Sequence, residues 1–322
     1  MNKSKSEFAR FPKLSGMPSY FNMNISEFAP KSVFTLCTIL TAFVTLFFVG
    51  FVFYTAYPTF ESQGLVNFIT GDRWSYDDHV FGIRMYLGGT LMLTLVTLVL
   101  SVPVGLLTAI FLSEFASARV AATLRPLIEL LVGIPSVVYG IFGLFVLAPI
   151  FASHVAPFTV SVLGFIPFFS STGDPRGVGL ALASTVLAIM ILPTIISVSE
   201  DSIRSVGFEY REASFSLGAT HWETISRVVL PAASKGIIAA VILGMMRAMG
   251  ETMAIVMLFG GAQEIPTMLF DPGMAMTNKI LADVGFKIHL EEARSAIFAV
   301  AAVLFAAEIL FVGLARAIGG RK

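Results

Sequence analysis

Six long apolar stretches dominate the 322-residue chain and restrict what it can fold into. A bilayer core about 30 Å thick is crossed by roughly 20 apolar residues in a helix, because backbone polar groups in lipid must be hydrogen-bonded internally. The sequence therefore predicts an all-α membrane protein, a bundle of six transmembrane helices. The predicted spans are residues 33–57, 85–112, 127–152, 178–198, 233–260 and 296–318.

Composition excludes several classes of protein. Hydrophobic residues make up 56% of the chain and charged residues 13%, whereas soluble domains carry about 25% charged residues. The 21 Lys and Arg balance the 21 Asp and Glu, which excludes a nucleic-acid binder that relies on a basic field. One cysteine, Cys37, cannot form an intrachain disulfide, and the four histidines share no metal-ligand spacing. We expect no metal, no cofactor, no catalytic residue and no enzyme activity of the chain's own.

The distribution of Lys and Arg predicts the orientation in the membrane. If the N-terminus is cytoplasmic, fourteen of these residues lie inside, six lie outside and one lies within a span. The positive-inside rule therefore favours two cytoplasmic termini. The apolar segment 155–169 is short and interrupted by prolines, so we interpret it as interfacial or re-entrant, with a seventh span as the less favoured alternative. The predicted organisation is a leader at 1–32, the first helix and an external loop at 33–84, a five-helix domain at 85–318 and a tail at 319–322.

Small residues four apart indicate close packing between helices. The fifth predicted span has a stripe of such residues, and the second and third spans repeat the spacing once each. These residues are Gly236, Ala240, Gly244 and Ala248, then Ser101 with Gly105, and Ser136 with Gly140. We interpret them as packing positions.

The cytoplasmic connection at 199–235 carries an unusual pattern. A short helix with apolar side chains is followed by Gly218, and a second helix begins at Thr220, with Glu223 placed to complete a capping box. Pro231 suits the first turn of the next helix. The sequence thus predicts a projecting helix–turn–helix whose apolar side chains need a partner to cover them.

The residues of this loop resemble the EAA motif of ABC importer permeases. The matching residues, at the spacing of that motif, are Glu212, Ala213, Ser214, Gly218, Val228, Leu230 and Pro231. Ser replaces the second Ala of the motif and Val replaces Ile. The resemblance implies that the loop at 209–231 couples to an ATPase subunit, with Glu212, Ala213, Gly218, Leu230 and Pro231 as the coupling residues. No G-x-x-x-x-G-K-[ST] phosphate loop occurs in the chain, so ATP must be used by another subunit.

Two ionisable residues lie deep in the fifth predicted span. Placing an arginine near the bilayer centre costs about 2.5–3.5 kcal/mol, so Arg247 is expected to have a role. Its i, i+4 spacing from Glu251 predicts a pair on one helix face. A guanidinium suits an oxyanion such as phosphate or sulfate, with Glu251 as the counterion when no anion is bound. A purely structural ion pair is the alternative.

The same region resembles the phosphate (Pst-type) permeases. The segment R-A-M-G-E-T-M-A at 247–254 and the segment at 130–144 are similar to the corresponding segments of that group. The resemblance implies a role in phosphate translocation for Arg247 and Glu251, with Ser136 and Tyr139 as weaker candidates. It also implies a PstC-like subunit in a prokaryotic inner membrane. The implied partners are a PstA-like permease, PstB-like ATPases and an external PstS-like phosphate-binding protein.

Other interpretations stay open at this point. The substrate could be molybdate or sulfate, or the chain could be a gradient-driven secondary transporter. Glu129 is interpreted as an ordinary i, i+4 partner of Arg125. Glu308, in the last span, has no partner in its own helix and is expected to face the bundle interior, with no role assigned.

Overall fold

The computed structural model describes residues 25–171, 173–174 and 176–319, and its named secondary-structure elements are helical apart from one short hairpin. Predictions for the leader up to residue 24 and for the tail beyond residue 319 lie outside the described residues. The α-helices are α1 (Ile25–Gln63), α2 (Leu65–Thr70), α3 (Arg84–Ile110), α4 (Ala118–Val132), α5 (Ser136–Phe142), α6 (Ala148–Ile150), α7 (Ala156–Leu163), α8 (Leu180–Arg204), α9 (Phe208–Ser216), α10 (His221–Thr224), α11 (Leu230–Gly250), α12 (Met253–Leu258), α13 (Met276–Lys287) and α14 (Glu291–Gly319). The remaining elements are the π-helical segments η1 (Phe111–Phe115), η2 (Gly143–Leu147), η3 (Phe151–Val155) and η5 (Ile225–Val229), the 3-10 turn η4 (Pro167–Phe169), and strands β1 (Trp74–Ser75) and β2 (Val80–Phe81).

Six helical segments of the described chain are long and apolar enough to cross a membrane, which confirms the predicted number. They are 31–63, 84–115, 136–163, 180–204, 221–250 and 291–317. The chain divides into two compact units, residues 1–51 and residues 52–322. In the first unit the described part is the first turns of α1, whose side chains from residue 33 to residue 48 are exposed. The second unit holds the other elements.

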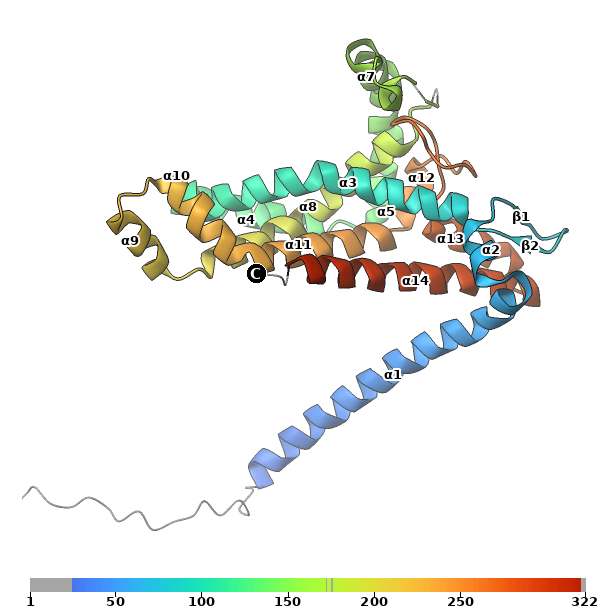
Figure 1. Ribbon diagram of the computed structural model, residues 1–322, viewed down its shortest axis with the longest axis horizontal. Helices are drawn as coiled ribbons and strands as arrows, with labels where there is room; N and C mark the ends of the chain where they lie inside the picture. The colour runs from blue at the N-terminus through green and yellow to red at the C-terminus, as the bar shows by residue number, and fades with distance from the viewer. Residues whose placement is uncertain (1–24, 172, 175, 320–322) are drawn as a thin grey trace, which may run out of the picture. The chain divides into compact units, whose positions relative to one another are not determined.

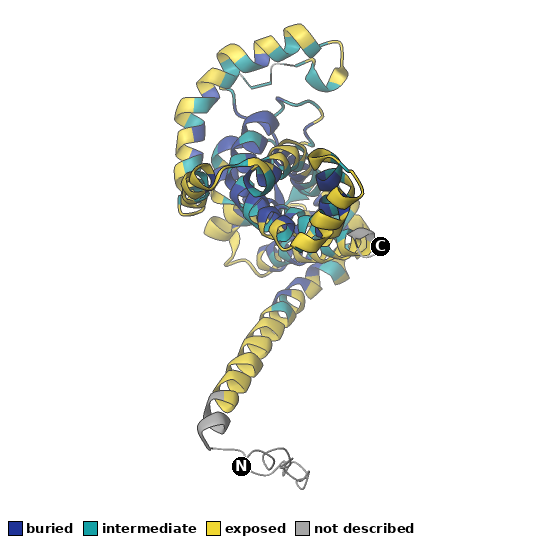
Figure 2. Cartoon of the chain, turned by 90° about the vertical axis from the view of Figure 1, so that its left-hand side faces the viewer, coloured by how far each residue is buried: buried dark blue, intermediate teal, exposed yellow. Residues whose placement is uncertain are grey.

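Helix α8 is the centre of the second unit. It packs along α3 and α11, and α11 also packs on α14, so these helices run side by side as a bundle (Figure 1). Buried residues gather in the middle of this bundle, and exposed residues lie on its outside (Figure 2). The predicted stripe of small residues faces α8: a Cβ on Gly236 would lie 2.0 Å from Ser202 Oγ, and one on Gly244 would lie 2.9 Å from Ile195 Cγ1. The packing interpretation is therefore confirmed.

The third predicted span differs from the structure. The helix expected at 127–152 is interrupted at Gly133–Pro135, where Pro135 adopts an extended backbone before α5. The residue before a proline avoids the helical region, so α4 ends there. The membrane-length helix instead runs from Ser136 to Leu163 through two π-helical turns, and its last part, α7, projects from the bundle (Figure 1). The first half of the segment 155–169 therefore continues this helix, and only η4 remains as a separate turn.

The fifth predicted span is also interrupted. α11 ends at Gly250, Glu251 is extended, and α12 begins at Met253. The membrane-length helix extends in the other direction, back to His221, through η5. The break therefore lies within the apolar segment that hydropathy predicts as one helix. Gly250 and Thr252, on either side of Glu251, are poor helix formers.

The two ends of the bundle carry different structures (Figure 1). At one end, α9 and α10 form the predicted helix–turn–helix. At the other end, α2, α13 and the β1–β2 hairpin pack together, with Trp74 paired opposite Phe81. The side chain of Ser295, at the start of α14, accepts a hydrogen bond from the Thr59 amide at 3.0 Å and fixes the end of α1 there.

Candidate functional site

The helix–turn–helix at 207–229, called the elbow below, has the local structure that its sequence predicts. Gly218 adopts a left-handed backbone with φ +83°, which glycine adopts without a side-chain penalty. Thr220 caps α10: its Oγ1 accepts from the Glu223 amide at 3.3 Å, and Glu223 Oε2 accepts from the Thr220 amide at 3.0 Å. The predicted capping box is confirmed.

The elbow presents apolar side chains to its surroundings. Leu217 is 89% exposed, and three aromatic residues of the elbow are more than half exposed. These aromatic residues are Phe208, Tyr210 and Trp222. Glu212 and Ala213 lie on the exposed side of α9, whereas Leu230 packs into a small core and Pro231 begins α11. A surface of this composition, concentrated on two short helices, is typical of a docking site.

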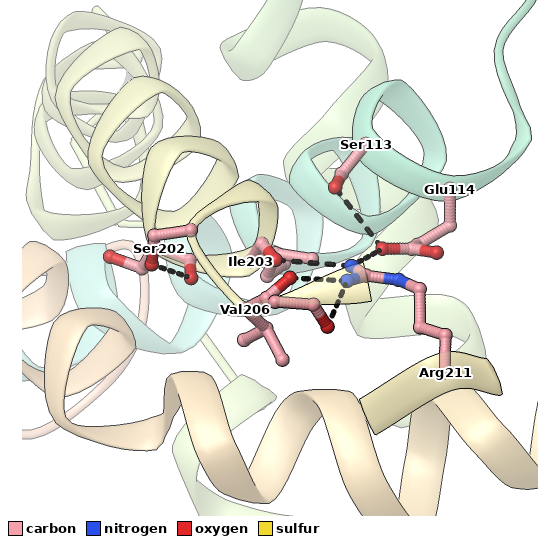
Figure 3. A network of polar contacts seen from close by, with 8 residues as sticks. Ser113, Glu114, Ser202, Ile203, Val206 and Arg211 are labelled. Carbon is pink, nitrogen blue, oxygen red and sulfur yellow. Dashed lines mark hydrogen bonds and ion pairs between the residues drawn. The ribbon is translucent and has the colours of Figure 1, made fainter. Parts of the chain in front are cut away.

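A buried ion pair fastens the elbow to the bundle (Figure 3). Arg211 Nη2 donates to Glu114 Oε1 at 2.7 Å, and both side chains are mostly buried, with exposures of 14% and 7%. The same guanidinium donates to backbone carbonyls at the end of α8, including that of Ile203 at 3.2 Å (Figure 3). Arg211 therefore joins α9 to α8 and η1. A surface pocket of about 490 Å³ opens beside it.

A second ion pair replaces one that the sequence predicts. The sequence predicts that Arg125 on α4 pairs with Glu129, but its Nε donates to Glu200 Oε1 on α8 at 2.7 Å. Glu129 is exposed. The i, i+4 prediction is wrong because α4 packs on α8, and this packing brings Arg125 to a carboxylate that is itself 5% exposed and needs a cation.

The break between α11 and α12 holds the ionisable residues predicted in the fifth span. Arg247 is half-buried in the last turn of α11, and Glu251 follows the end of this helix. The predicted i, i+4 pair is wrong, because the helix stops at Gly250 and Glu251 Oε1 accepts from the Ala254 amide at 3.3 Å. Within the described residues, Arg247 forms no ion pair.

Two further elements border the break. α5 packs on α12, and Tyr139 of α5 lies close enough to Arg247 for an electrostatic interaction, while its hydroxyl donates to the Leu131 carbonyl at 3.0 Å. Ser136 lies one turn earlier, at the start of α5. From α14, Glu308 Oε1 lies 4.0 Å from where a Cβ on Gly250 would stand. The structure therefore brings Tyr139 and Glu308 to the break and leaves Ser136 at its edge.

Comparison with known proteins identifies the family. The family model of the binding-protein-dependent transport system inner membrane component matches residues 101–322. The chain belongs to this family. The probable ABC transporter permease protein YqgH of Bacillus subtilis (strain 168) is 32% identical over 94% of this chain and 93% of that protein. The phosphate transport system permease protein PstC of Mesorhizobium japonicum is 35% identical over 78% of this chain and 77% of that protein, and PstC of Haemophilus influenzae is 38% identical over 66% and 69%.

Solved structures show the same fold. A bacterial alginate ABC transporter, in complex with a periplasmic protein bound to alginate pentasaccharide, superposes with a TM-score of 0.57 at 17% identity, covering 92% of this chain and 96% of that one. The MetNI methionine ABC transporter in an inward-facing conformation gives 0.51 at 20% identity, covering 72% and 91%. At this level of identity the likeness concerns the fold alone. It supports the six-helix architecture of this inner-membrane component.

Sequence reasoning missed three features of this inner-membrane component. Arg211 directly precedes the motif that the loop resembles, but its partner Glu114 lies 97 positions away and cannot be found from local spacing. The helix break next to Arg247 is signalled only by the Gly-Glu-Thr sequence at 250–252. The proximity of Glu308 to Gly250 depends on the packing of α14 on α11 and has no sequence signal.

The Arg211–Glu114 pair predicts a large effect on stability. Replacing Arg211 with Met leaves Glu114 buried without a cation, which costs about 3 kcal/mol. We expect a lower thermal unfolding midpoint for the detergent-purified chain, with partial recovery in the double variant Arg211→Met/Glu114→Gln. The control is Arg227→Met: Arg227 is 78% exposed and lies 3.9 Å from Glu223, so its loss should change little. Equal shifts for Arg211→Met and Arg227→Met would show that the buried Arg211–Glu114 pair does not stabilise the chain.

Proposed function

We propose that this chain is the transmembrane permease subunit of an ATP-driven importer that moves inorganic phosphate across a prokaryotic plasma membrane. The main support is Arg247, a half-buried residue at a helix break inside an apolar segment, which forms no ion pair with any residue that the structure describes. An arginine at this depth is functional by default, and its planar fork of donors matches a tetrahedral oxyanion. The relatives named PstC support phosphate as that oxyanion.

In this proposal the site around the break is formed by Arg247, Glu251, Tyr139 and Ser136. Arg247 binds the anion, and Tyr139 lies close enough to contribute to its surroundings. Glu251 has a different role from the one that its spacing predicts: it caps α12 and so fixes the position of the break. Ser136 is the weakest member, because it lies one turn away from Tyr139 along α5.

The elbow is the coupling element of this proposal. An ATPase subunit, PstB-like, docks on the apolar surface around Leu217, and Glu212, Ala213 and Gly218 lie on or beside that surface. Leu230 and Pro231 connect the elbow to α11, which leads to Arg247. The other proposed partners are a PstA-like second permease and a PstS-like phosphate-binding protein that delivers phosphate to the opposite end of the bundle. Nucleotide state then biases a two-state transition of the bundle.

Two alternatives make different predictions. A permease for sulfate or molybdate would show competition of those anions with labelled phosphate during uptake. A gradient-driven secondary transporter would keep transporting in vesicles without ATP. The exposed apolar surface of the elbow favours the ATP-driven importer, because a secondary transporter has no need of a docking site there.

Arg247→Gln should abolish phosphate uptake, because the neutral amide cannot replace the charge that compensates for the dehydration of the anion. Labelled phosphate uptake into cells is measured beside the amount of inserted and assembled complex, which should stay unchanged. Arg204→Gln is the matched control, since Arg204 is 54% exposed at the end of α8. Normal uptake by Arg247→Gln would refute the translocation role.

Gly218→Trp should prevent co-purification of the ATPase. Among the described residues other than its chain neighbours, a Cβ at Gly218 meets no atom within 4 Å, so the tryptophan ring itself would clash only with a docked partner, while the left-handed backbone is strained for a side chain in either variant. Gly218→Asn is the control, because asparagine tolerates the left-handed backbone and adds less volume. If the tryptophan variant still assembles and transports, the elbow is not the docking site.

The proposed orientation places the elbow in the cytoplasm and the β1–β2 hairpin outside. In a Cys37→Ser background, an impermeant thiol reagent should label Asp78→Cys in intact cells and Ser216→Cys only after the membrane is opened. Both positions are exposed, so labelling reports the side of the membrane rather than burial. The reverse pattern would overturn the orientation and, with it, ATPase docking on the elbow.

A further inference from the structure

An aromatic cage at the hairpin end of the bundle encloses a buried lysine. Lys279 is 5% exposed, and its Nζ lies 4.7 Å from the ring centre of Trp74 and 5.4 Å from that of Tyr86. Its carboxylate partner is Asp283, one turn later on α13, at 3.0 Å. Burial lowers the pKa of Lys279, and the neighbouring carboxylate of Asp283 opposes this shift. A buried charged pair of this kind is costly to form and is a poor source of stability alone.

The cage joins the hairpin to α13. The Tyr76 hydroxyl, next to β1, donates to Asp283 Oδ2, and Trp74 and Phe81 of the hairpin pack edge to face, 5.1 Å apart. Burial and then the hydrogen bond to Asp283 raise the pKa of Tyr76, so the phenol stays a proton donor. The turn of the hairpin at 77–79 is exposed. A displacement of this turn would therefore also displace α13, through the contacts of Tyr76 and the cage.

The first turn of α13 is in turn bonded to the helix break. The Thr277 hydroxyl, two residues before Lys279, donates to the Glu251 carbonyl at 2.9 Å, and Thr277 is 6% exposed. The Met276 amide donates to Thr90 Oγ1 of α3 at 2.9 Å. The segment leading into α13 also fits tightly against α3, since a Cβ on Gly89 would lie 2.3 Å from the Met274 carbonyl oxygen. The start of α13 thus has little freedom to move without moving the Glu251 peptide.

We propose that Lys279 is a positioning residue that links the outer hairpin to the translocation site, through Thr277 and the Glu251 carbonyl. A partner that presses on the hairpin would shift α13 and with it the backbone beside Arg247. This inference rests on the proposed function for the identity of that partner, the phosphate-loaded binding protein. The link itself consists of contacts within this chain and does not depend on which anion is carried.

Two substitutions cut the link at different points. Lys279→Met is made together with Asp283→Asn, so that no buried carboxylate is left without its cation, and this pair of changes is written Lys279→Met below; it keeps a long side chain that packs among the aromatic rings but removes the charge. Thr277→Val keeps the volume and removes only the hydroxyl that holds the Glu251 carbonyl. The matched control is Thr267→Val, whose hydroxyl bonds to Asp271 in the loop before α13, away from the break.

The first measurement uses the whole complex in proteoliposomes. We expect Lys279→Met and Thr277→Val each to lower the stimulation of ATP hydrolysis by the loaded binding protein about tenfold, while basal hydrolysis and assembly stay within twofold. The double variant should be no worse than the worse single variant, because two cuts in one link are not additive. Multiplying effects, or unchanged stimulation in either single variant, would overturn the proposal.

The second measurement reports on the break directly. A nitroxide on Met253→Cys, in a Cys37→Ser background, lies at the 47%-exposed first residue of α12. Lys279→Met and Thr277→Val should both increase its mobility in the spin-label spectrum, and Thr267→Val should not. An unchanged spectrum in both variants would show that the cage only stabilises the outer end. The spectrum is recorded without substrate. It therefore tests the link between Lys279 and the break even if the wild-type complex turns out not to transport phosphate.

Discussion

The close approach of α3 and α11 to α8 is the constraint on which the rest of the structure depends. In lipid there is little hydrophobic drive between helices, so contact relies on small residues that let backbones come near. Gly105 of α3 and Gly244 of α11 both lie against Ile195 of α8, where an added Cβ would stand 2.7 and 2.9 Å from its side chain. One residue of the central helix thus sets the spacing of both neighbours. The elbow and the helix break are held at fixed positions along α11 by this packing.

Hydropathy and short motifs predict much of this architecture because both are local. The number of spans follows from apolar length, and the capping box of Thr220 and Glu223 follows from spacing within one turn. Span boundaries fail where local chemistry opposes apolar length, as at Pro135 and at Gly250. Hydropathy averages over many residues, so it cannot detect a two-residue interruption. Such an interruption is identified only from the backbone conformation of the folded chain.

Local sequence predicts the partners of buried ion pairs poorly, and the reason is physical. Residues one turn apart on a helix can always be proposed as a pair, but a buried carboxylate selects the cation that tertiary packing brings closest. Arg125 therefore pairs with Glu200 of α8 rather than with Glu129. Lys279 is the opposite case: its partner Asp283 is at i+4, but its burial under the rings of the hairpin is not visible in the local sequence.

The second unit has one continuous helical path between its two candidate sites. The membrane-length segment runs from His221, in the elbow, to Gly250, beside the break, so a rotation of the elbow about this axis reaches Arg247 without crossing a loop. Arg211 adds a second attachment, to the end of α8 and to η1 at the end of α3. Thr90 of α3 also binds the start of α13. The outer cage and the elbow therefore act on the same two helices, α3 and α11, from opposite ends. The break next to Arg247 follows the last turn of α11, and the Thr277 hydroxyl binds its Glu251 carbonyl. The helical hydrogen-bond ladder is already interrupted there, so the break can change conformation without breaking a regular helix.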